Sequence, residues 1–264
     1  MIPEIKEIEN QFLVNLIKEN HFSLYKKIAD FPAIKSFQGE EYSFILTEKA
    51  EWPNMIYDLR ITNENTSAVL KKLNNENELK SNRSYLIIDS ISKTVDFDKI
   101  ARQYSFMPIM RWPGMVYILS KSDLYNDAEK SITIKMVNSS KEMSDWINIS
   151  NKTLFTHQGI TIDVFLPVLD SGIKLYMAYY KDIPAATLMI HDNEETTGLY
   201  VGSTLPEFRG KGIMSRLFNY VNSIAYDRKL KYSILEANAN SHKLYTNLGY
   251  RTVCNFDIFM KMQK

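Results

Sequence analysis

Cysteine is almost absent from this chain of 264 residues, in which Cys254 is the only one. A single cysteine excludes an intrachain disulfide, so a reducing, cytoplasmic compartment is the simplest expectation. No signature of a nucleophile surrounds Cys254. We therefore expect it to be a small buried residue in a strand.

The chain also lacks an excess of charge of either sign. Lys and Arg number 32 against 31 Asp and Glu, which leaves a formal net charge of +1. A nucleic-acid-binding protein typically shows a strong basic excess, and none is present here. We expect no nucleic-acid partner.

Long apolar runs and metal-ligand spacings are missing as well. No run approaches the roughly 20 residues of a membrane-spanning helix, and the start Met-Ile-Pro-Glu-Ile-Lys-Glu does not have the layout of a signal peptide. His191 and His242 stand apart from any cluster of ligands, so we expect no metal. The chain as a whole is 45% apolar and 24% charged, as in an ordinary globular protein.

Hydrophobic periodicity predicts a mixture of helices and strands along the whole chain. In the first half, we expect helices at 5–17, 64–73 and 96–104, and strands at 42–46, 54–59, 85–88 and 114–119. In the second half, we expect strands at 132–137, 173–180, 185–191, 232–237, 250–254 and 256–260, a further strand that starts near 196 and passes through Gly202 before Pro206, and helices at 139–154, 162–169, 213–225 and 241–248. The segment 120–130 is polar and aperiodic, which is typical of a linker and divides the chain into domains at 1–125 and 126–264.

The stretch Thr196–Met214 carries the strongest chemical signal. A run of β-forming residues passes through Gly202 and Pro206 and then delivers Arg209-Gly-Lys-Gly212 onto the start of an amphipathic helix. Glycines at a helix start let backbone N–H groups approach a ligand closely, and the helix dipole favours negative charge there. The pattern indicates a site for a phosphate-bearing ligand, with an ordinary glycine-rich turn as the alternative.

Two segments of the second half resemble signatures of the GNAT superfamily of N-acetyltransferases. Leu205–Met214 is similar to the acyl-CoA signature, in which Arg209 and Gly212 match and Met214 replaces the usual Gly or Ala. Asn238–Tyr250 is similar to a second signature, Asn-x-x-Ala-x-x-Leu-Tyr-x-x-x-Gly-Phe, with Ser241 in place of Ala. The resemblance covers about residues 130–264.

The resemblance implies an α+β fold with a central, mostly antiparallel sheet flanked by helices. It also implies acetyl-CoA as co-substrate and an amine-bearing small molecule or peptide as acceptor. A bulge at Gly202 would free backbone groups for the pantetheine arm, and the amides after Arg209 would hold the pyrophosphate. The implied cofactor-binding residues are Gly202, Ser203, Thr204, Arg209, Gly210, Lys211, Gly212, Ile213, Met214, Asn238 and Tyr245.

Tyr245 stands where many members of the superfamily place a general acid that protonates the departing thiolate. The phenol is suited to that role because it is protonated at neutral pH. The general base stays open. The family's carboxylate position corresponds to Thr196, and the candidates are Glu195 or its neighbour Glu194, Glu236, and a chain of waters.

The first half contains only Gly39 and Gly114 and has no Arg-x-x-Gly-x-Gly motif. Its end, residues 104–119, resembles the closing strands of a GNAT domain. The arrangement is similar to tandem-GNAT proteins whose N-terminal copy is degenerate. Such a copy would form one side of the acceptor site. We expect an acyl-CoA-dependent N-acyltransferase, with a non-catalytic acyl-CoA sensor or interaction module as the alternative. The sequence does not indicate an oligomeric state.

Overall fold

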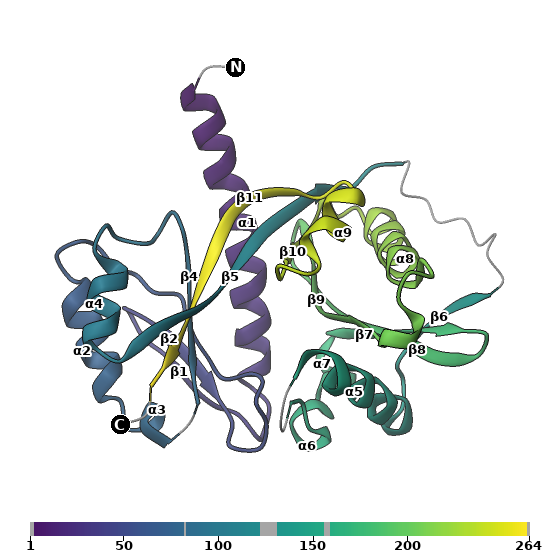
Figure 1. The fold of residues 1–264 in the computed structure, drawn as a ribbon, viewed down its shortest axis with the longest axis horizontal. Coiled ribbons are helices and arrows are strands. Elements are labelled where there is room, and N and C mark those ends of the chain that lie inside the picture. The colour runs from purple at the N-terminus through teal and green to yellow at the C-terminus, as the bar shows by residue number, and fades with distance from the viewer. Residues whose placement is uncertain (1–2, 82, 122–130, 156–158, 263–264) are drawn as a thin grey trace.

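A computed structural model describes residues 3–81, 83–121, 131–155 and 159–262 (Figure 1). An eleven-stranded sheet runs through both halves of the chain in the order β1-β2-β3-β4-β11-β5-β10-β9-β8-β7-β6. The first half forms α1 (Pro3–Ile28), β1 (Lys35–Gln38), β2 (Ser43–Leu46), β3 (Met55–Tyr57), α2 (Thr66–Asn75), α3 (Glu78–Ser81), β4 (Tyr85–Asp89), α4 (Phe97–Gln103) and β5 (Phe106–Ile118).

The second half follows the predicted order of helices and strands closely. It forms β6 (Ile132–Met136), α5 (Ser140–Leu154), α6 (Ile162–Phe165), α7 (Val168–Ser171), β7 (Lys174–Tyr180), β8 (Ile183–Asp192), β9 (Thr196–Thr204), a 3-10 turn (Pro206–Phe208), α8 (Ile213–Asp227), β10 (Tyr232–Glu236), α9 (His242–Asn247) and β11 (Arg251–Lys261). At the start of α5 the hydroxyl of Ser139 accepts from the amide of Glu142, as in a capping box. The expected α+β class with a mostly antiparallel sheet is confirmed.

Several predicted boundaries are wrong. The strand predicted at 114–119 begins at Phe106 and passes through Pro108 and Pro113, and the two strands predicted at 250–260 are one strand, β11. β5 and β11 pair along most of their lengths, and register shifts absorb the irregular positions. The helix predicted at 162–169 is two short helices on either side of Pro167, because proline cannot continue the hydrogen-bond ladder.

The last strand of each half is inserted between strands of the other half. β5, from the first half, lies between β10 and β11, with Val116 opposite both Ile234 and Arg251. β11, from the end of the chain, lies between β4 and β5, with Ile258 opposite Ile87. Hydrogen bonding is therefore continuous across the middle of the sheet. The domains 1–125 and 126–264 stay a prediction, and most of the predicted linker lies outside the described residues.

The two halves repeat one pattern of strand directions. In the first half, β1, β2 and β3 are antiparallel, β3 and β4 are parallel, and β11 follows antiparallel. In the second half, β7, β8 and β9 are antiparallel, β9 and β10 are parallel, and β5 follows antiparallel. Each half thus contains one parallel pair next to the strand contributed by the other half.

Helix α1 joins the halves on one face of the sheet, where it contacts β5, β8, β9 and β11 (Figure 1). Its residues Leu13 and Ile17 belong to a core that also contains Tyr57 of the first half and Trp146 of the second. Cys254 is buried in the same core, as predicted, and burial raises the pKa of its thiol to about 12. Within the described residues, no helix combines the length and the hydropathy that a membrane crossing needs.

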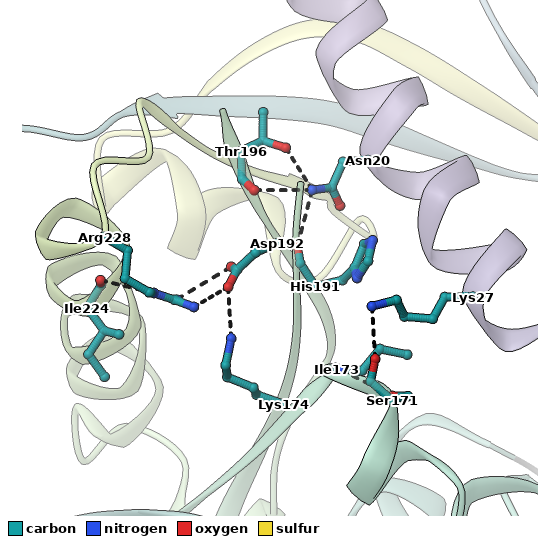
Figure 2. A network of polar contacts seen from close by, with 10 residues as sticks. All are labelled: Asn20, Lys27, Ser171, Ile173, Lys174, His191, Asp192, Thr196, Ile224 and Arg228. Atoms are coloured by element: carbon teal, nitrogen blue, oxygen red, sulfur yellow. Dashed lines mark hydrogen bonds and ion pairs between the residues drawn. The ribbon is translucent and has the colours of Figure 1, made fainter. Parts of the chain in front are cut away.

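A buried asparagine fixes α1 to the strands of the second half (Figure 2). Asn20 is fully buried, and its Nδ2 donates to Thr196 Oγ1 at 2.7 Å and to the carbonyl of His191 at 3.1 Å. Its Oδ1 accepts from the Tyr200 hydroxyl at 2.7 Å. A Cβ placed on Gly198 would lie only 2.1 Å from that oxygen. Gly198 is therefore the residue that allows the close approach.

Gly198→Ala is expected to destabilise the protein by about 2 to 4 kcal/mol, because the added methyl overpacks the site and displaces buried hydrogen bonds. Urea unfolding measures the loss. The double variant Asn20→Ala/Gly198→Ala is the control, since removing the asparagine side chain removes the nearest obstacle. We expect it to lose less than the sum of the two single variants. Strict additivity would show that the contact does not limit position 198.

His191 is held neutral beside the same helix. Only 4% of it is exposed, and its Nε2 lies 2.7 Å from the Ser23 hydroxyl of α1. Burial chiefly, and then the charge of Lys27, lower the pKa of His191 to about 4, although Asp192 acts in the opposite direction. Asp192 itself accepts hydrogen bonds from Arg228 and from Lys174 (Figure 2), the latter at 2.9 Å.

The lowered pKa of His191 predicts a loss of stability in mild acid. A histidine in the unfolded chain has a pKa of about 6.5. Between about pH 6.5 and pH 4, His191 is therefore protonated in the unfolded chain but neutral in the folded protein, which favours unfolding. We expect His191 to contribute about 2 kcal/mol of this loss by about pH 5. Urea unfolding of wild type and His191→Gln at neutral pH and at that pH measures it. Equal pH dependence of the two proteins would contradict the prediction.

Candidate functional site

A cleft opens where β9 and β10 separate. The two strands pair in parallel over three residue pairs that end at Gly198 and Ile234. Beyond that point β10 is paired through Leu235 and Glu236 with β5 on its other side. The facing edges of β9 and β10 therefore diverge in the middle of the sheet, just before the two predicted signatures begin at Leu205 and Asn238.

A bulge lies on the β9 side of this cleft, at the predicted position. Thr187 pairs with Ser203 and Met189 with Tyr200, so two residues of β9, 201 and 202, face the single residue 188 of β8. Val201 has a φ of 49°, which is uncommon for a β-branched residue. A bulge leaves one residue out of the ladder and re-aims its backbone groups. The predicted bulge at Gly202 is confirmed.

The start of α8 forms the second wall of the cleft. Gly210 and Gly212 have φ values of 76° and 72°, which favour glycine, and Gly212 is the N-cap residue without a side-chain cap. A Cβ on either glycine would meet no atom within 4 Å, so the space in front of them is open. The first amides of a helix have no intrahelical acceptor and lie at the positive end of its dipole. The geometry suits an anionic group.

The cleft contains a cavity of about 590 Å³ at this place. Its lining includes Gly202, Ser203, Thr204, Arg209, Gly210, Gly212, Ile213, Met214, Asn238 and Tyr245 from the sequence prediction, together with residues such as Thr153, Leu154 and Leu244 that the prediction missed. Lys211 is not among the lining residues, because its Nζ lies over the ring of Tyr180, 5.6 Å from the centroid. The Nε of Arg209 donates to the carbonyl of Thr204 at 3.1 Å.

Tyr245, on α9, faces the bulge. The side chain is buried and its ring stacks on Phe218 with centroids 5.1 Å apart. Its hydroxyl lies 3.8 Å from the place that a Cβ on Gly202 would occupy. Burial raises the pKa of Tyr245 above its ordinary value, and a hydrogen bond with Ser241 acts against this. The phenol is therefore a protonated, buried donor at neutral pH.

Asn238 fixes the turn that leads into α9. Its Oδ1 accepts from the amides of Asn240 and Ser241, both at 2.9 Å. Such a turn around an asparagine side chain is a common way to order a short loop. The turn holds the first residues of α9 against the cleft, and through them it positions Tyr245.

A second cavity of about 330 Å³ adjoins the first. The residues that line both cavities are Leu154, Gly202, Asn238, Ser241 and Tyr245, all from the second half. The second cavity is also lined from the first half, by the aromatic rings of Tyr25, Trp52, Tyr85 and Trp112. The two cavities therefore meet at the bulge and the Tyr245 hydroxyl.

Glu236 and His21 form a buried pair in this second cavity. Oε1 of Glu236 lies 2.7 Å from Nδ1 of His21, and the two side chains are 6% and 5% exposed. The His21 ring packs between Tyr25 and Tyr200, with centroid distances of 4.5 and 5.4 Å. Both tyrosine hydroxyls have raised pKa values, through burial first and the Glu236 charge second. Sequence reasoning missed His21, because it lies on α1, far from either signature.

The other candidate bases lie elsewhere. Glu195 precedes β9, pairs with Lys231, and is not among the described residues that line either cavity. Glu194 is exposed beside it. The cleft opens at the middle of β9, several residues beyond these side chains, and Thr196 is occupied by its hydrogen bond to Asn20. Of the named glutamates, only Glu236 is brought to the site.

Neither histidine singled out in the sequence lines a cavity within the described residues. His242 is half-buried, with its Nε2 2.9 Å from the Thr252 hydroxyl, and His191 belongs to the α1 contact. Across residues 3–81, 83–121, 131–155 and 159–262, no group of three or more His, Cys, Asp or Glu side chains is arranged to hold a metal ion.

Comparison with known proteins gives one family and many similar folds. Residues 141–250 match the acetyltransferase (GNAT) family. A GCN5-related N-acetyltransferase from Kribbella flavida superposes with a TM-score of 0.68 at 12% identity, covering 91% of this chain and 93% of that one. A putative GNAT acetyltransferase from Novosphingobium aromaticivorans gives 0.57 at 14% identity, covering 86% and 92%.

A tandem GNAT protein from the clavulanic acid biosynthesis pathway is also similar, with a TM-score of 0.57 at 10% identity and coverage of 87% of this chain and 83% of that one. No curated protein matches the sequence. At identities this low the similarity shows a shared fold, which includes the first half as well as the second.

Proposed function

We propose that this chain is an acyl-CoA-dependent N-acyltransferase of the GNAT superfamily that transfers an acyl group, most simply acetyl, directly to an amine. The observation that carries the proposal is the meeting of three features in one cleft. These are the open helix start at Gly212, the bulge at Gly202, and the buried hydroxyl of Tyr245. All three lie in the part of the chain that matches the acetyltransferase family.

The cleft fits the donor acetyl-CoA as a co-substrate. The unpaired amides at the start of α8, residues 212–215, suit the pyrophosphate, and Gly210 and Gly212 leave the space before them open. The edge of β9 at Ser203 and Thr204 would pair with the amide-bearing pantetheine arm. Its thioester would then lie at the junction of the two cavities. The donor supplies an activated acyl group, and the protein supplies position and proton transfer.

The residues at the junction can perform direct transfer. The amine nitrogen forms a bond to the carbonyl carbon, and a backbone donor of the bulge stabilises the developing oxyanion. Glu236, supported by His21, takes a proton from the bound ammonium and so frees the nitrogen lone pair that attacks. As the carbon–sulfur bond breaks, the Tyr245 hydroxyl donates its proton to the thiolate, and the second proton that the nitrogen loses on becoming an amide restores the phenol. The products are an amide and CoA with its thiol protonated.

The first half is proposed to be a degenerate GNAT copy within residues 1–125, and the catalytic copy to lie within 126–264. The repeated pattern of strand directions supports a duplication, and the absence of an Arg-x-x-Gly-x-Gly motif in the first half supports loss of its donor site. Because the first half also lines the second cavity, we propose that it contributes to acceptor binding.

A screen of primary amines with thiol detection tests the proposed activity. We expect CoA release that requires both acetyl-CoA and a responsive amine, with one acetyl-CoA bound per chain. Tight binding of acetyl-CoA without release on any amine would instead support a non-catalytic sensor or interaction module.

A further inference from the structure

Among the described residues that line the second cavity, Glu51 has the one charged side chain that the proposed chemistry does not use. Its Oε2 atom is buried and has no hydrogen-bond partner among the described residues. The side chain lines the cavity together with Trp52 and Tyr85. The charge of Glu51 also acts on Tyr85. Burial is the main cause of the raised pKa of Tyr85, Arg83 opposes it, and Glu51 adds to it.

The loop that carries Glu51 is held in place from both halves of the chain. The amides of Glu51 and Trp52 both donate to the carbonyl of Gly159, at 2.8 and 3.2 Å. From the other side, Nδ2 of Asn54 donates to the carbonyls of Ala50 and Glu51, at 3.0 and 3.3 Å. The carboxylate is therefore presented to the cavity by an anchored backbone.

A buried carboxylate oxygen without a partner is costly, and a cationic ligand offsets that cost. Lys49, two residues before Glu51, does not supply that charge, because its Nζ lies 3.8 Å from a carboxylate oxygen of Asp163 and both side chains are largely exposed. The aromatic faces of Trp52 and Trp112 in the same lining add cation–π attraction. This end of the cavity has the chemistry of an ammonium site.

The proposed ammonium site and the junction of the two cavities are lined from different halves of the chain. The residues shared by both cavities, Tyr245 among them, all come from the second half, whereas Glu51 comes from the loop between β2 and β3. The other carboxylate, Glu236, lies two residues before Asn238, which lines both cavities. Glu236 thus lies close in sequence to a residue of the junction, whereas Glu51 comes from the first half of the chain.

We infer that the acceptor is a small dication, in which one amine reacts at the junction while a second ammonium group is held by Glu51 and the aromatic rings beside it. This inference rests on the proposed acyl transfer. A cavity of about 330 Å³ suits a short diamine in size. A singly charged amine would leave the Glu51 carboxylate unpaired, and an amino acid would bring a second negative charge to it.

The test compares three amines of matched length: 1,4-diaminobutane, n-butylamine and 4-aminobutanoate. With acetyl-CoA as donor, we expect wild type to favour the diamine over butylamine by about tenfold or more in kcat/KM, the size of one buried charged hydrogen bond. Glu51→Gln should bring this ratio close to one. Glu48→Gln, an exposed glutamate of the same loop paired with Lys35, is the matched control and should keep the wild-type ratio.

A binding measurement separates this inference from the proposed function. Titration calorimetry with 1,4-diaminobutane on the protein saturated with CoA needs no turnover, and we expect Glu51→Gln to weaken binding about tenfold. If the amines are acetylated but Glu51→Gln leaves the diamine preference unchanged, the ammonium site is wrong and the acyl transfer stands. If the diamine binds through Glu51 and no amine is acetylated, the site stands and the acyl transfer is wrong.

Discussion

Tyr245→Phe is expected to lower kcat about 100-fold, the contribution of a positioned general acid. The change removes one oxygen and keeps the ring that stacks on Phe218. The affinity for acetyl-CoA should therefore change little, and the loss should appear in kcat. Steady-state thiol release and equilibrium binding of acetyl-CoA separate the two effects. Because burial raises the pKa of Tyr245, the wild-type rate should show no loss of this acid below about pH 10.

Tyr250→Phe is the matched control. The Tyr250 hydroxyl is buried nearby and bonds to Ser233 and Asn222, but among the described residues it lines neither cavity. We expect a loss of about 1 kcal/mol in stability with kcat preserved. If Tyr245→Phe turns over as fast as wild type, another group or a water protonates the thiolate and the assignment is wrong.

Glu236→Gln is expected to lower kcat/KM about 100-fold near neutral pH, because the amine must then arrive already deprotonated. The defect should shrink as the pH rises towards the pKa of the amine, since the free base becomes more abundant. A pH profile of kcat/KM for wild type and variant measures this recovery. The amide keeps the size of the side chain and one hydrogen-bonding oxygen for His21, so binding of acetyl-CoA should persist.

Glu195→Gln is the control for the base. Its carboxylate pairs with Lys231 at the surface, and among the described residues it lines neither cavity, so its removal should leave kcat/KM as in wild type. The opposite result, a large loss with Glu195→Gln and none with Glu236→Gln, would move the base to the start of β9 and contradict the arrangement proposed here.

The donor side of the candidate site was predictable because its signals are local. The residues between Arg209 and Met214 are contiguous, and their glycines mark positive φ angles that few other residues adopt. The bulge was predictable for the same reason, since Gly202 interrupts a run of β-forming residues. Asn238 and Tyr245 followed from a second contiguous signature.

The acceptor side was not predictable, because its residues come together only through the fold. His21 reaches Glu236 across 215 positions of sequence, and Glu51 comes from a short loop of the first half. Neither residue sits in a pattern that distinguishes it from a solvated surface residue. The helix predicted at 5–17 ends before His21, whereas α1 continues to Ile28, and the packing of α1 against the sheet brings His21 to the site.

The long strands were misjudged because local breaks in a pattern were given too much weight. Pro108 and Pro113 lie within β5, although proline in a sequence normally argues against a central strand. The partner strand absorbs the irregularity through register shifts, one between Ile258 and Phe259 opposite Pro108. Such compensation depends on a strand roughly 150 positions away, which no local window includes.

The reciprocal insertion of β5 and β11 also determines when the protein can acquire its structure during synthesis. β5 has both of its neighbours, β10 and β11, in the part of the chain made later, and β11 is made after the other strands of this sheet. A nascent chain that has produced the first half still lacks the strand between β4 and β5. Closing such distant pairs costs chain entropy before any contact offsets it, so the central sheet should assemble late and slowly. Until then β4 and β5 have edges whose backbone N–H and C=O groups are unpaired. Such edges can pair with other chains, so we expect the incomplete chain to need chaperones to prevent aggregation.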